Sequence, residues 1–322
     1  MQVVGLYAHN DIKLKAAKQI EQASYYSVQE RSGFLDNGSL GYTIGEREQK
    51  EALESESTAY IGTIIGSVTD QIEAIAGREY QQSGSQLVAP EGNIRAKALK
   101  GTVDAVYEQG RRWQHSEWHQ SGLTVSVSAP VIAAAQTGQQ MLQASTQVSD
   151  PLMHMLAAGT IALGAKNAYD AIQADPKTAG GVTVSVMMGE SHQEFQQTQR
   201  SATALGSKIT AGGTVHMEVE GSGEASTLNI IGSKIEAKQD VQLKVAGPLK
   251  IEAAPNTFIQ HSEQHSQSSA AGVAATLGTH SSLGAAVAIS SGRGHADGVE
   301  VSHTPAQIKA GRKLMLNAQI II

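Results

Sequence analysis

Apolar and polar residues alternate in short runs along residues 228–253, which predicts several short β-strands in succession. Strict alternation places the apolar side chains of each run on one face and the polar ones on the other. Turn-forming or polar pairs separate the runs, and Leu249 takes the position that Leu228 held 21 residues earlier. The apolar positions are Leu228, Ile230, Ile235, Ala237, Val241, Leu243, Val245, Leu249, Ile251 and Ala253.

A unit of three strands and three corners that repeats after about 20 residues is typical of a parallel β-helix. One coil alone leaves its apolar face in water, whereas stacked coils cover one another and pair their backbone groups about 4.8 Å apart. We therefore predict a mainly β protein, a right-handed parallel β-helix with a helical insertion.

The spacing recurs, at offsets of 0, 2, 6, 8 and 10 residues from a first apolar position. An alanine fills the second position each time, and Asn-Gly hairpin turns are scarce, which favours the β-helix over a β-sandwich. The sets are Ile235, Ala237, Val241, Leu243 and Val245; Ile209, Ala211, Val215, Met217 and Val219; Leu6, Ala8, Ile12, Leu14 and Ala16; Ile308, Ala310, Leu314, Leu316 and Ala318; and, with one extra residue, Leu87, Ala89, Ile94, Ala96 and Ala98.

The pattern divides the chain into three parts. Residues 1–107 are expected to form a first β-helix block, with a polar excursion at 24–57 that forms a loop or a short hairpin. Residues 108–180 hold an aromatic and basic patch and then an Ala-rich helical hairpin, in which Asp150 and Pro151 start a helix. Residues 181–322 form a second block with a low-complexity excursion at 261–298. Neither end has a polar cap, so we expect a segment of a longer protein.

Composition narrows the picture. Only 4% of the 322 residues are aromatic, which suits a narrow interior filled by Val, Ile, Leu and Ala. The net charge of −6 argues against a nucleic-acid partner. Cysteine is absent, which excludes disulfides and thiolate metal sites. No signal peptide is visible at the start, and no apolar stretch reaches the about 20 residues of a membrane span.

Two segments carry a resemblance to a known family. Residues 227–256 closely resemble the haemagglutinin repeat of filamentous haemagglutinin-like exoproteins, and so do residues 80–98. The likeness rests on a Gly-Ser-x-Ile/Leu-x-Ala core. In the first segment it includes Ile230, Gly232, Ser233, Ala237, Asp240, Val241, Leu243 and Ala253, and in the second Gln82, Ser83, Gly84, Ser85, Leu87, Ala89 and Pro90.

The resemblance implies a function. Such proteins leave Gram-negative bacteria through an outer-membrane two-partner transporter and serve as adhesins or as stalks of contact-dependent growth-inhibition toxins. It implies a structural segment of a longer secreted or cell-surface protein that meets a host or target-cell receptor and holds no cofactor. The repeat type is implicated in toxin passage across the target's outer membrane, so residues 131–172 are a candidate for outer-membrane contact; the alternative is a helical hairpin packed on the solenoid flank. Two further alternatives are a β-helical carbohydrate-active enzyme and a non-functional remnant of a truncated exoprotein gene.

Candidate contact residues lie in the aromatic and basic patch. They are Trp113, Trp118, His115 and His119. The alternative for the two tryptophans is a cap over the β-helix where the helical insertion docks. His115 and His119, like His261 and His265, are four residues apart, a spacing that brings imidazoles together on a helix. Neither pair has a third ligand at useful spacing, and the outward ladder positions show no acidic cluster, so we expect no metal site and no catalytic residues.

Overall fold

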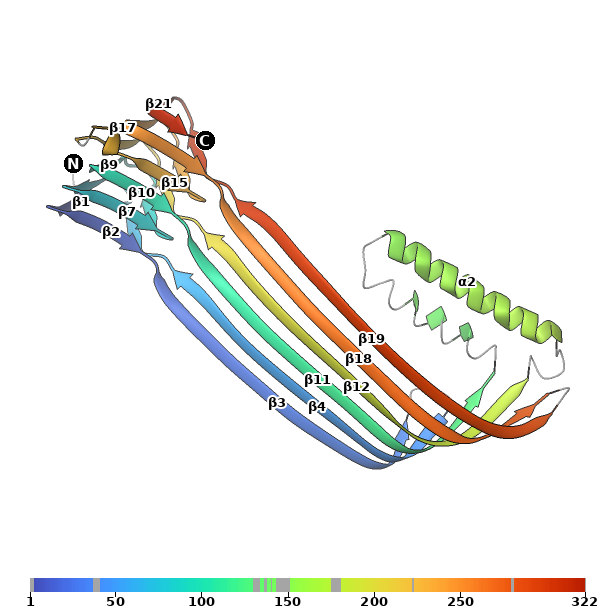
Figure 1. Cartoon of the computed structure of the whole chain (residues 1–322). Helices are drawn as coiled ribbons and strands as arrows, with labels where there is room; N and C mark the ends of the chain where they lie inside the picture. The colour runs from blue at the N-terminus through green and yellow to red at the C-terminus, as the bar shows by residue number, and fades with distance from the viewer. Residues whose placement is uncertain are drawn as a thin grey trace.

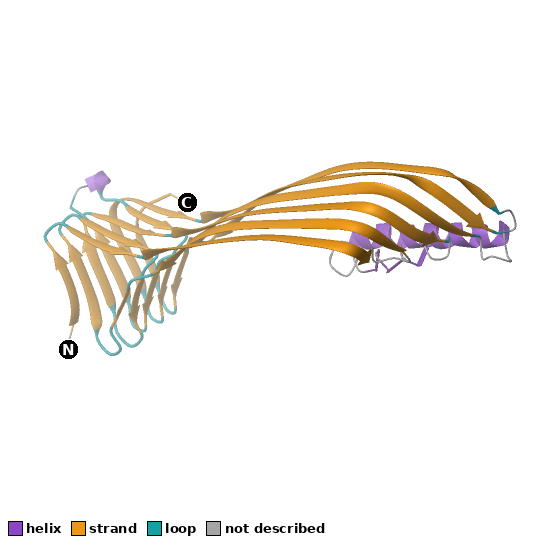
Figure 2. Cartoon of the chain, turned by 90° about the horizontal axis from the view of Figure 1, so that it is seen from below, coloured by secondary structure: helices purple, strands orange, loops and turns teal. Residues whose placement is uncertain are grey.

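The computed structural model describes residues 3–36, 41–129, 134–135, 138–139, 141–142, 151–174, 181–221, 223–278 and 281–321. A short solenoid lies at one end, and a long, curved sheet of six strands extends from it, with a helix beside the sheet's far end (Figures 1 and 2). Both chain ends lie in the solenoid (Figure 1).

The solenoid is a parallel β-helix with three faces, which confirms the predicted fold class. The first face contains β1 (Val3–Ala8), β6 (Gln71–Ala76), β9 (Ile94–Ala98), β14 (Val215–Val219) and the starts of β17 (Val241–Glu252) and β21 (Leu314–Ile321). The second contains β2 (Asp11–Lys15), β7 (Glu79–Ser83), β10 (Lys100–Asp104), β15 (Leu228–Ile231) and the ends of β17 and β21. The third contains β5 (Ile64–Gly66), β8 (Gln86–Ala89), β13 (Lys208–Ala211), β16 (Lys234–Ala237) and β20 (Gln307–Ala310).

The interior consists of side-chain columns that run from rung to rung. Leu87, Ile209 and Ile235 pair in sequence and are fully buried, and an alanine follows each two residues later. A narrow interior of this kind is filled without large rings. Tyr80 is the exception: it is buried, its hydroxyl donates to Oε1 of Gln82 at 2.7 Å, and burial raises the pKa of this phenol.

One column is polar and stacks at a corner. Ser85, Ser207 and Ser233 occupy the same position in three successive rungs and are buried. The Ser207 hydroxyl accepts from the Ser85 amide at 3.2 Å and donates to the Gln82 carbonyl oxygen at 2.9 Å, and the Ser233 hydroxyl accepts from the Ser207 amide at 3.0 Å. The serine of the Gly-Ser corner therefore satisfies backbone groups that the turn would otherwise leave unpaired in the interior.

The register corrects one of the predicted sets. Ile308 pairs with Ile235 as expected. Leu6, however, pairs with Ala74 on the first face, and Ile12 pairs with Tyr80 on the second. The set that starts at Leu6 therefore lies one face further along the rung than predicted. The error arose because the offsets within one strand and across one corner are similar.

Three pairs of long strands leave the solenoid at the same corner. They depart where the second face ends and return where the third begins, on every second rung. The pairs are β3 (Ala17–Asp36) with β4 (Gly41–Ile61), β11 (Val106–Ser128) with β12 (Val182–Leu205), and β18 (Ala254–Leu277) with β19 (Ser282–Thr304). They lie side by side in the order β19-β18-β12-β11-β4-β3 (Figure 1).

The alternation of rungs has a geometric reason. Strands in a sheet and rungs in a solenoid have the same spacing of about 4.8 Å. A two-stranded pair is therefore as wide as two rungs, and one pair on every second rung continues the sheet without a gap. On the rungs between, the chain turns directly from β7 to β8 and from β15 to β16, at Gly84 and Gly232.

The long strands correct three expectations. The excursion at 24–57 is neither a loop nor a short hairpin but most of β3 and β4. The patch after residue 108 lies inside β11, and the excursion at 261–298 lies inside β18 and β19. The rungs on either side of residues 108–180 belong to one continuous solenoid, because β9 pairs with β14 and β8 with β13.

Helix α2 (Pro151–Ala174) begins at Pro151 and ends before Asp175 and Pro176. The described residues between 134 and 142 are also helical, and an added Cβ at Gly164 would lie 3.8 Å from Cα of Ala134, so the two segments are neighbours. Asp150 lies outside the described residues. No helix in the described part of the chain is long and apolar enough to cross a membrane.

Candidate partner-contact surface

The strand register shows on which of the two faces of the six-stranded sheet each side chain lies. Successive side chains point to opposite sides, and directly paired residues point to the same side. We call the face that bears Trp113 the front face and the one that bears Trp118 the back face. The register runs without interruption across all six strands, so it assigns every described residue of the sheet to one of these faces.

The four predicted contact residues do not share one surface. Trp113, His115 and His119 lie on the front face, and the Trp113 indole stacks on the His115 ring with centroids 5.8 Å apart. Trp118 lies on the back face, where the guanidinium of Arg47 is 5.5 Å from its ring centroid. Both tryptophans belong to β11 and pair with β4 and β12, so neither caps the solenoid as the alternative interpretation supposed.

Histidines and carboxylates gather on the front face. His115 Nε2 lies 3.0 Å from Glu194, and Lys50 Nζ lies 3.7 Å from Glu117. Carboxylates outnumber Lys and Arg on this face, so it is acidic when its histidines are neutral. The histidines are His115, His119, His192, His261, His265 and His295. The carboxylates of these rows and of the next row toward the solenoid are Glu30, Glu48, Glu54, Glu56, Glu117, Glu194, Glu263 and Asp297, and the Lys and Arg residues are Lys50, Arg111, Arg200 and Arg293.

The histidine pairs four residues apart do not meet. His115 and His119 lie on one strand, as do His261 and His265. Four residues of strand span about 13 Å, whereas the same spacing on a helix brings side chains together. The described ranges hold no group of three side chains able to bind a metal ion.

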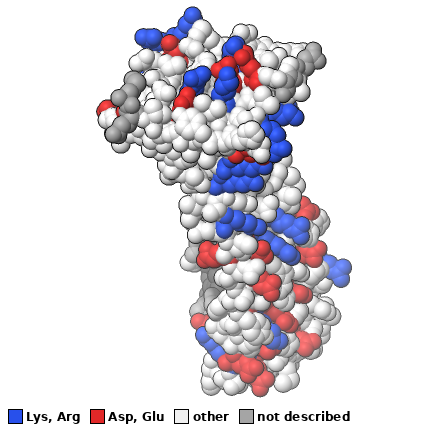
Figure 3. Space-filling view, turned by 90° about the vertical axis from the view of Figure 1, so that its left-hand side faces the viewer, with Lys and Arg blue, Asp and Glu red and all other residues white. Residues whose placement is uncertain are grey.

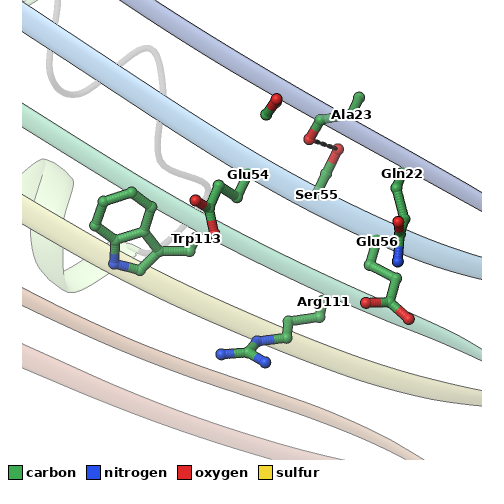
Figure 4. A pocket seen from close by; sticks show the side chains of 8 residues that line it. Gln22, Ala23, Glu54, Ser55, Glu56, Arg111 and Trp113 are labelled. Atoms are coloured by element: carbon green, nitrogen blue, oxygen red, sulfur yellow. Dashed lines mark hydrogen bonds between the residues drawn. The ribbon is translucent and has the colours of Figure 1, made fainter.

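Two shallow hollows adjoin one another near the solenoid end of the front face. The first, of about 340 Å³, is lined by Gln22, Glu54, Glu56, Arg111 and Trp113 (Figure 4). The second, of about 440 Å³, shares Glu56 and Arg111 and reaches Arg200, Thr257 and Ile259. Acidic and basic side chains also mix along the flank shown in Figure 3, where basic ones gather near the junction with the solenoid.

Beyond one row of the sheet, the front face changes from charged to apolar. The row contains Gly33, Gly45, Gly122 and Gly189, paired strand to strand. A side chain at Gly45 would collide with the Ser121 carbonyl oxygen of the next strand, so the backbones approach closely here. We call the part beyond this row the tip, residues 34–36, 41–44, 123–128, 182–188, 271–277 and 282–287, and the remainder of the six strands the shaft.

The front face of the tip is apolar and exposed. Phe34 is 78% exposed, Met188 68% and Val287 74%, and all three lie in the row next to the glycines. A shallow hollow of about 720 Å³ crosses this region from Ile44 to Ile289. The front-face side chains of the tip include Phe34, Tyr42, Ile44, Leu123, Val125, Val127, Val182, Val184, Val186, Met188, Val273, Leu277, Leu283 and Val287.

The back face of the tip is polar and covered. Leu35 is 5% exposed and Thr43 only 1%. Side chains on the open face of a single sheet are not buried to this extent, so other residues pack on the back face of the tip. Hydroxyls on this face pair across strands: Thr43 with Thr124 at 2.8 Å, and Ser126 with Ser185 at 2.7 Å. Figure 1 shows α2 beside the concave side of the tip. On the back face Thr43 is buried and its hydroxyl partners are half-buried, whereas Phe34, Met188 and Val287 on the front face are largely exposed.

The apolar tip is the feature that sequence reasoning missed. Its signal was present, since Leu283, Ala285 and Val287 alternate with small residues, as do Val182, Val184 and Val186. From the sequence, the second run is expected at the start of the second β-helix block and the first run in the low-complexity excursion at 261–298. Only the register of the six strands shows that these runs form one surface.

Comparison with known proteins agrees with the fold. A family model for the hemagglutinin repeat matches residues 172–319. Deoxyribonuclease CdiA of Yersinia pseudotuberculosis is 28% identical over 263 residues, which cover 79% of this chain and 24% of that protein. tRNA nuclease CdiA of Yersinia mollaretii is 28% identical over 330 residues, which cover 98% of this chain and 11% of that protein.

A third relative, tRNA nuclease CdiA-2 of Burkholderia pseudomallei, is 28% identical over 246 residues, which cover 73% of this chain and 8% of that protein. The chain thus spans about a quarter or less of the length of these curated relatives. Its resemblance to the haemagglutinin-repeat region of filamentous haemagglutinin-like and contact-dependent growth-inhibition exoproteins is confirmed: residues 172–319 match the hemagglutinin-repeat model, and the chain is similar over most of its length to a segment of CdiA proteins.

Proposed function

We propose that this chain is a structural stalk segment of a large bacterial exoprotein that acts in adhesion or toxin delivery, and that the front face of the tip contacts the outer membrane of the target cell. The β-helix holds three strand pairs in register and projects them away from the solenoid. The chain has no catalytic task of its own in this proposal. Export by an outer-membrane two-partner transporter, a location at the cell surface and a receptor on the target belong to the whole exoprotein.

The observation that carries the proposal is the exposed apolar front face of the tip. Full burial of a side chain such as Phe34, Met188 or Val287 is worth about 1.5–3 kcal/mol. Several of them lie in adjacent rows, so even shallow burial in lipid sums to a useful affinity. The contact is thus proposed on strands, whereas from the sequence it is expected at residues 131–172.

Vesicle flotation tests the membrane contact. The vesicles contain phosphatidylethanolamine and phosphatidylcholine, so that net lipid charge does not influence binding. We expect the full chain to float with them, and the double variant Met188→Glu/Val287→Glu to lose at least tenfold in bound fraction.

The matched control carries the same two charges on the front face of the shaft. Gln267→Glu/Ser291→Glu lies on β18 and β19, four rows from the tip, and should bind as the unsubstituted chain does. Far-ultraviolet circular dichroism and urea midpoints confirm that both variants fold. Equal flotation of the two double variants would contradict the proposal that the front face of the tip contacts the membrane.

A further inference from the structure

Two arginines face each other across neighbouring strands. Arg111 of β11 and Arg200 of β12 are paired directly, and both lie on the front face. Directly opposite side chains have Cβ atoms about 4.5–5.5 Å apart, and like charges at that distance are destabilising. Within the described part of the chain, neither guanidinium forms an ion pair or a side-chain hydrogen bond, although Glu56 lies opposite Arg111 on its other side.

The arginine pair lies on the floor of the hollow of about 440 Å³, and Arg111 also borders the hollow of about 340 Å³ that holds Trp113 (Figure 4). The two hollows therefore form one groove across the strands. Its second half presents two guanidiniums, and its first half presents an indole beside carboxylate and amide groups. Stacking on His115 keeps the indole in place.

We propose that this groove binds an anionic saccharide, with its sulfate, phosphate or carboxylate group between Arg111 and Arg200 and a sugar ring on Trp113. Guanidinium groups bind such anions through paired, charge-assisted hydrogen bonds. An indole offers a flat apolar face, and Glu54 and Gln22 accept or donate hydrogen bonds to ring hydroxyls. A bound anion also offsets the repulsion between the two arginines.

The surroundings select against other anions. Glu54 and Glu56 border the groove, and further carboxylates follow along the front face, so a nucleic acid with one charge per nucleotide would meet repulsion at most positions. A saccharide with scattered charges and many hydroxyls fits this mixture of groups. The site is separate from the tip, and the inference does not rest on the proposed membrane contact.

Tryptophan fluorescence provides a direct test. The chain has two tryptophans, so Trp118→Phe leaves Trp113 as the only reporter. This variant is titrated with a chondroitin sulfate tetrasaccharide, with maltotetraose and with sodium sulfate. We expect saturable quenching by the sulfated tetrasaccharide, and at least tenfold weaker responses to maltotetraose and to sulfate at equal concentration.

Arginine variants assign the anion site. Arg111→Gln and Arg200→Gln should each weaken tetrasaccharide binding at least tenfold. Arg112→Gln is the matched control, because Arg112 is the next residue of β11, is exposed and lies on the back face; its effect should stay below twofold. Urea midpoints should remain unchanged or rise in Arg200→Gln, since the substitution removes a like-charge pair.

Two outcomes would overturn the inference. Equal weakening by Arg112→Gln would show general attraction to basic side chains, and full binding by Arg111→Gln would show that the pair is not used. A second arm uses vesicles with and without lipopolysaccharide to distinguish a membrane-borne saccharide from a free one; no arginine-dependent binding in either arm also overturns it. The tip variant Met188→Glu/Val287→Glu keeps the groove, so its tetrasaccharide binding should be unchanged even if the membrane contact fails.

Discussion

Substitution of Gly232 by alanine tests how closely the strand pairs of the neighbouring rungs pack against the corner between β15 and β16. Gly232 forms the corner between β15 and β16 with a φ of +55°. An added Cβ would lie 2.5 Å from Cβ of Ala254, the first residue of β18, and 3.4 Å from Cβ of Ala105, just before β11. The corner is therefore enclosed by the strand pairs of the two neighbouring rungs.

Alanine substitutions at two other glycines separate the two causes of the expected loss of stability, which are backbone strain and steric overlap. Gly223 has a φ of +56° and open space around its Cβ position, so Gly223→Ala measures the left-handed backbone strain alone, about 1–2 kcal/mol. Gly84 has a φ of +58°, and its Cβ would lie 2.5 Å from Cγ2 of Val106, a side-chain methyl, and 3.2 Å from the fixed Cβ of Ala16. In Gly232→Ala the obstacle is a Cβ fixed to the backbone, which adds about 1–3 kcal/mol of overpacking.

The assay is urea unfolding followed by circular dichroism, with free energies taken from the midpoints. We expect a loss of about 2–5 kcal/mol for Gly232→Ala, about 1–2 kcal/mol for Gly223→Ala, and an intermediate value for Gly84→Ala. Equal losses for the Gly223 and Gly232 variants would refute the enclosure of this corner by adjacent strand pairs.

Three further predictions concern the interior and one surface pair. Ile235→Ala removes a fully buried side chain from its column and should lower the unfolding free energy by about 2–5 kcal/mol in urea titration. Gln82→Leu leaves the buried Tyr80 hydroxyl without its acceptor, and should cost about 1–3 kcal/mol, part of which a second Tyr80→Phe substitution restores. The pKa of His261 is raised above 6.5 by hydrogen bonds to Asp297 and a neighbouring glutamate, and the pKa of Asp297 is lowered by His261. The ion pair stabilises the fold fully between the lowered pKa of Asp297 and the ordinary pKa of histidine. The stabilisation is lost as pH rises through the raised pKa of His261, because the imidazole then loses its charge. It is also lost as pH falls through the lowered pKa of Asp297, because the carboxylate is then protonated. The midpoint difference between the unsubstituted chain and His261→Gln should therefore be largest near pH 5 and absent at alkaline pH.

The rungs were predictable from the sequence because equivalent positions have the same environment on every coil. Inward positions of the solenoid are buried on every coil, so Ile209, Ile235 and Ile308 repeat the same chemistry at the same spacing. The Gly-Ser corners repeat for the same reason, since the hydroxyls of Ser207 and Ser233 each accept a hydrogen bond from a backbone amide of the neighbouring rung. The set at Leu6 shows the limit: alternation identifies a strand but does not say which face of the triangle it occupies.

The long strands were not predictable from local pattern. Strands usually have about five or six residues, whereas these have 20 or more. In the shaft both faces meet water, so no apolar period of two marks them as β, and polar runs such as residues 24–57 read as loops. Pairing over their whole length, rather than burial of one face, is what orders them.

The candidate groove was also not predictable from the sequence. Arg111 and Arg200 are 89 positions apart in the chain, and only the register of β11 and β12 makes them neighbours. Trp113 was singled out for its residue type, but nothing local indicated that Trp118 points to the opposite face. Assignment of β11 as a strand would have separated the two tryptophans, since positions of odd separation lie on opposite sides.

The most direct test of the stalk with a membrane-contacting tip is a set of single-cysteine labels. The chain has no cysteine, so each substitution creates one site for an environment-sensitive fluorophore. Val287→Cys reports on the front face of the tip, Ala286→Cys on its back face and Ser291→Cys on the front face of the shaft. On addition of phosphatidylethanolamine and phosphatidylcholine vesicles, we predict a blue shift and stronger emission at position 287 alone. No change at 287, or an equal change at 291, would contradict the proposal that the tip is the part of the stalk that contacts the membrane.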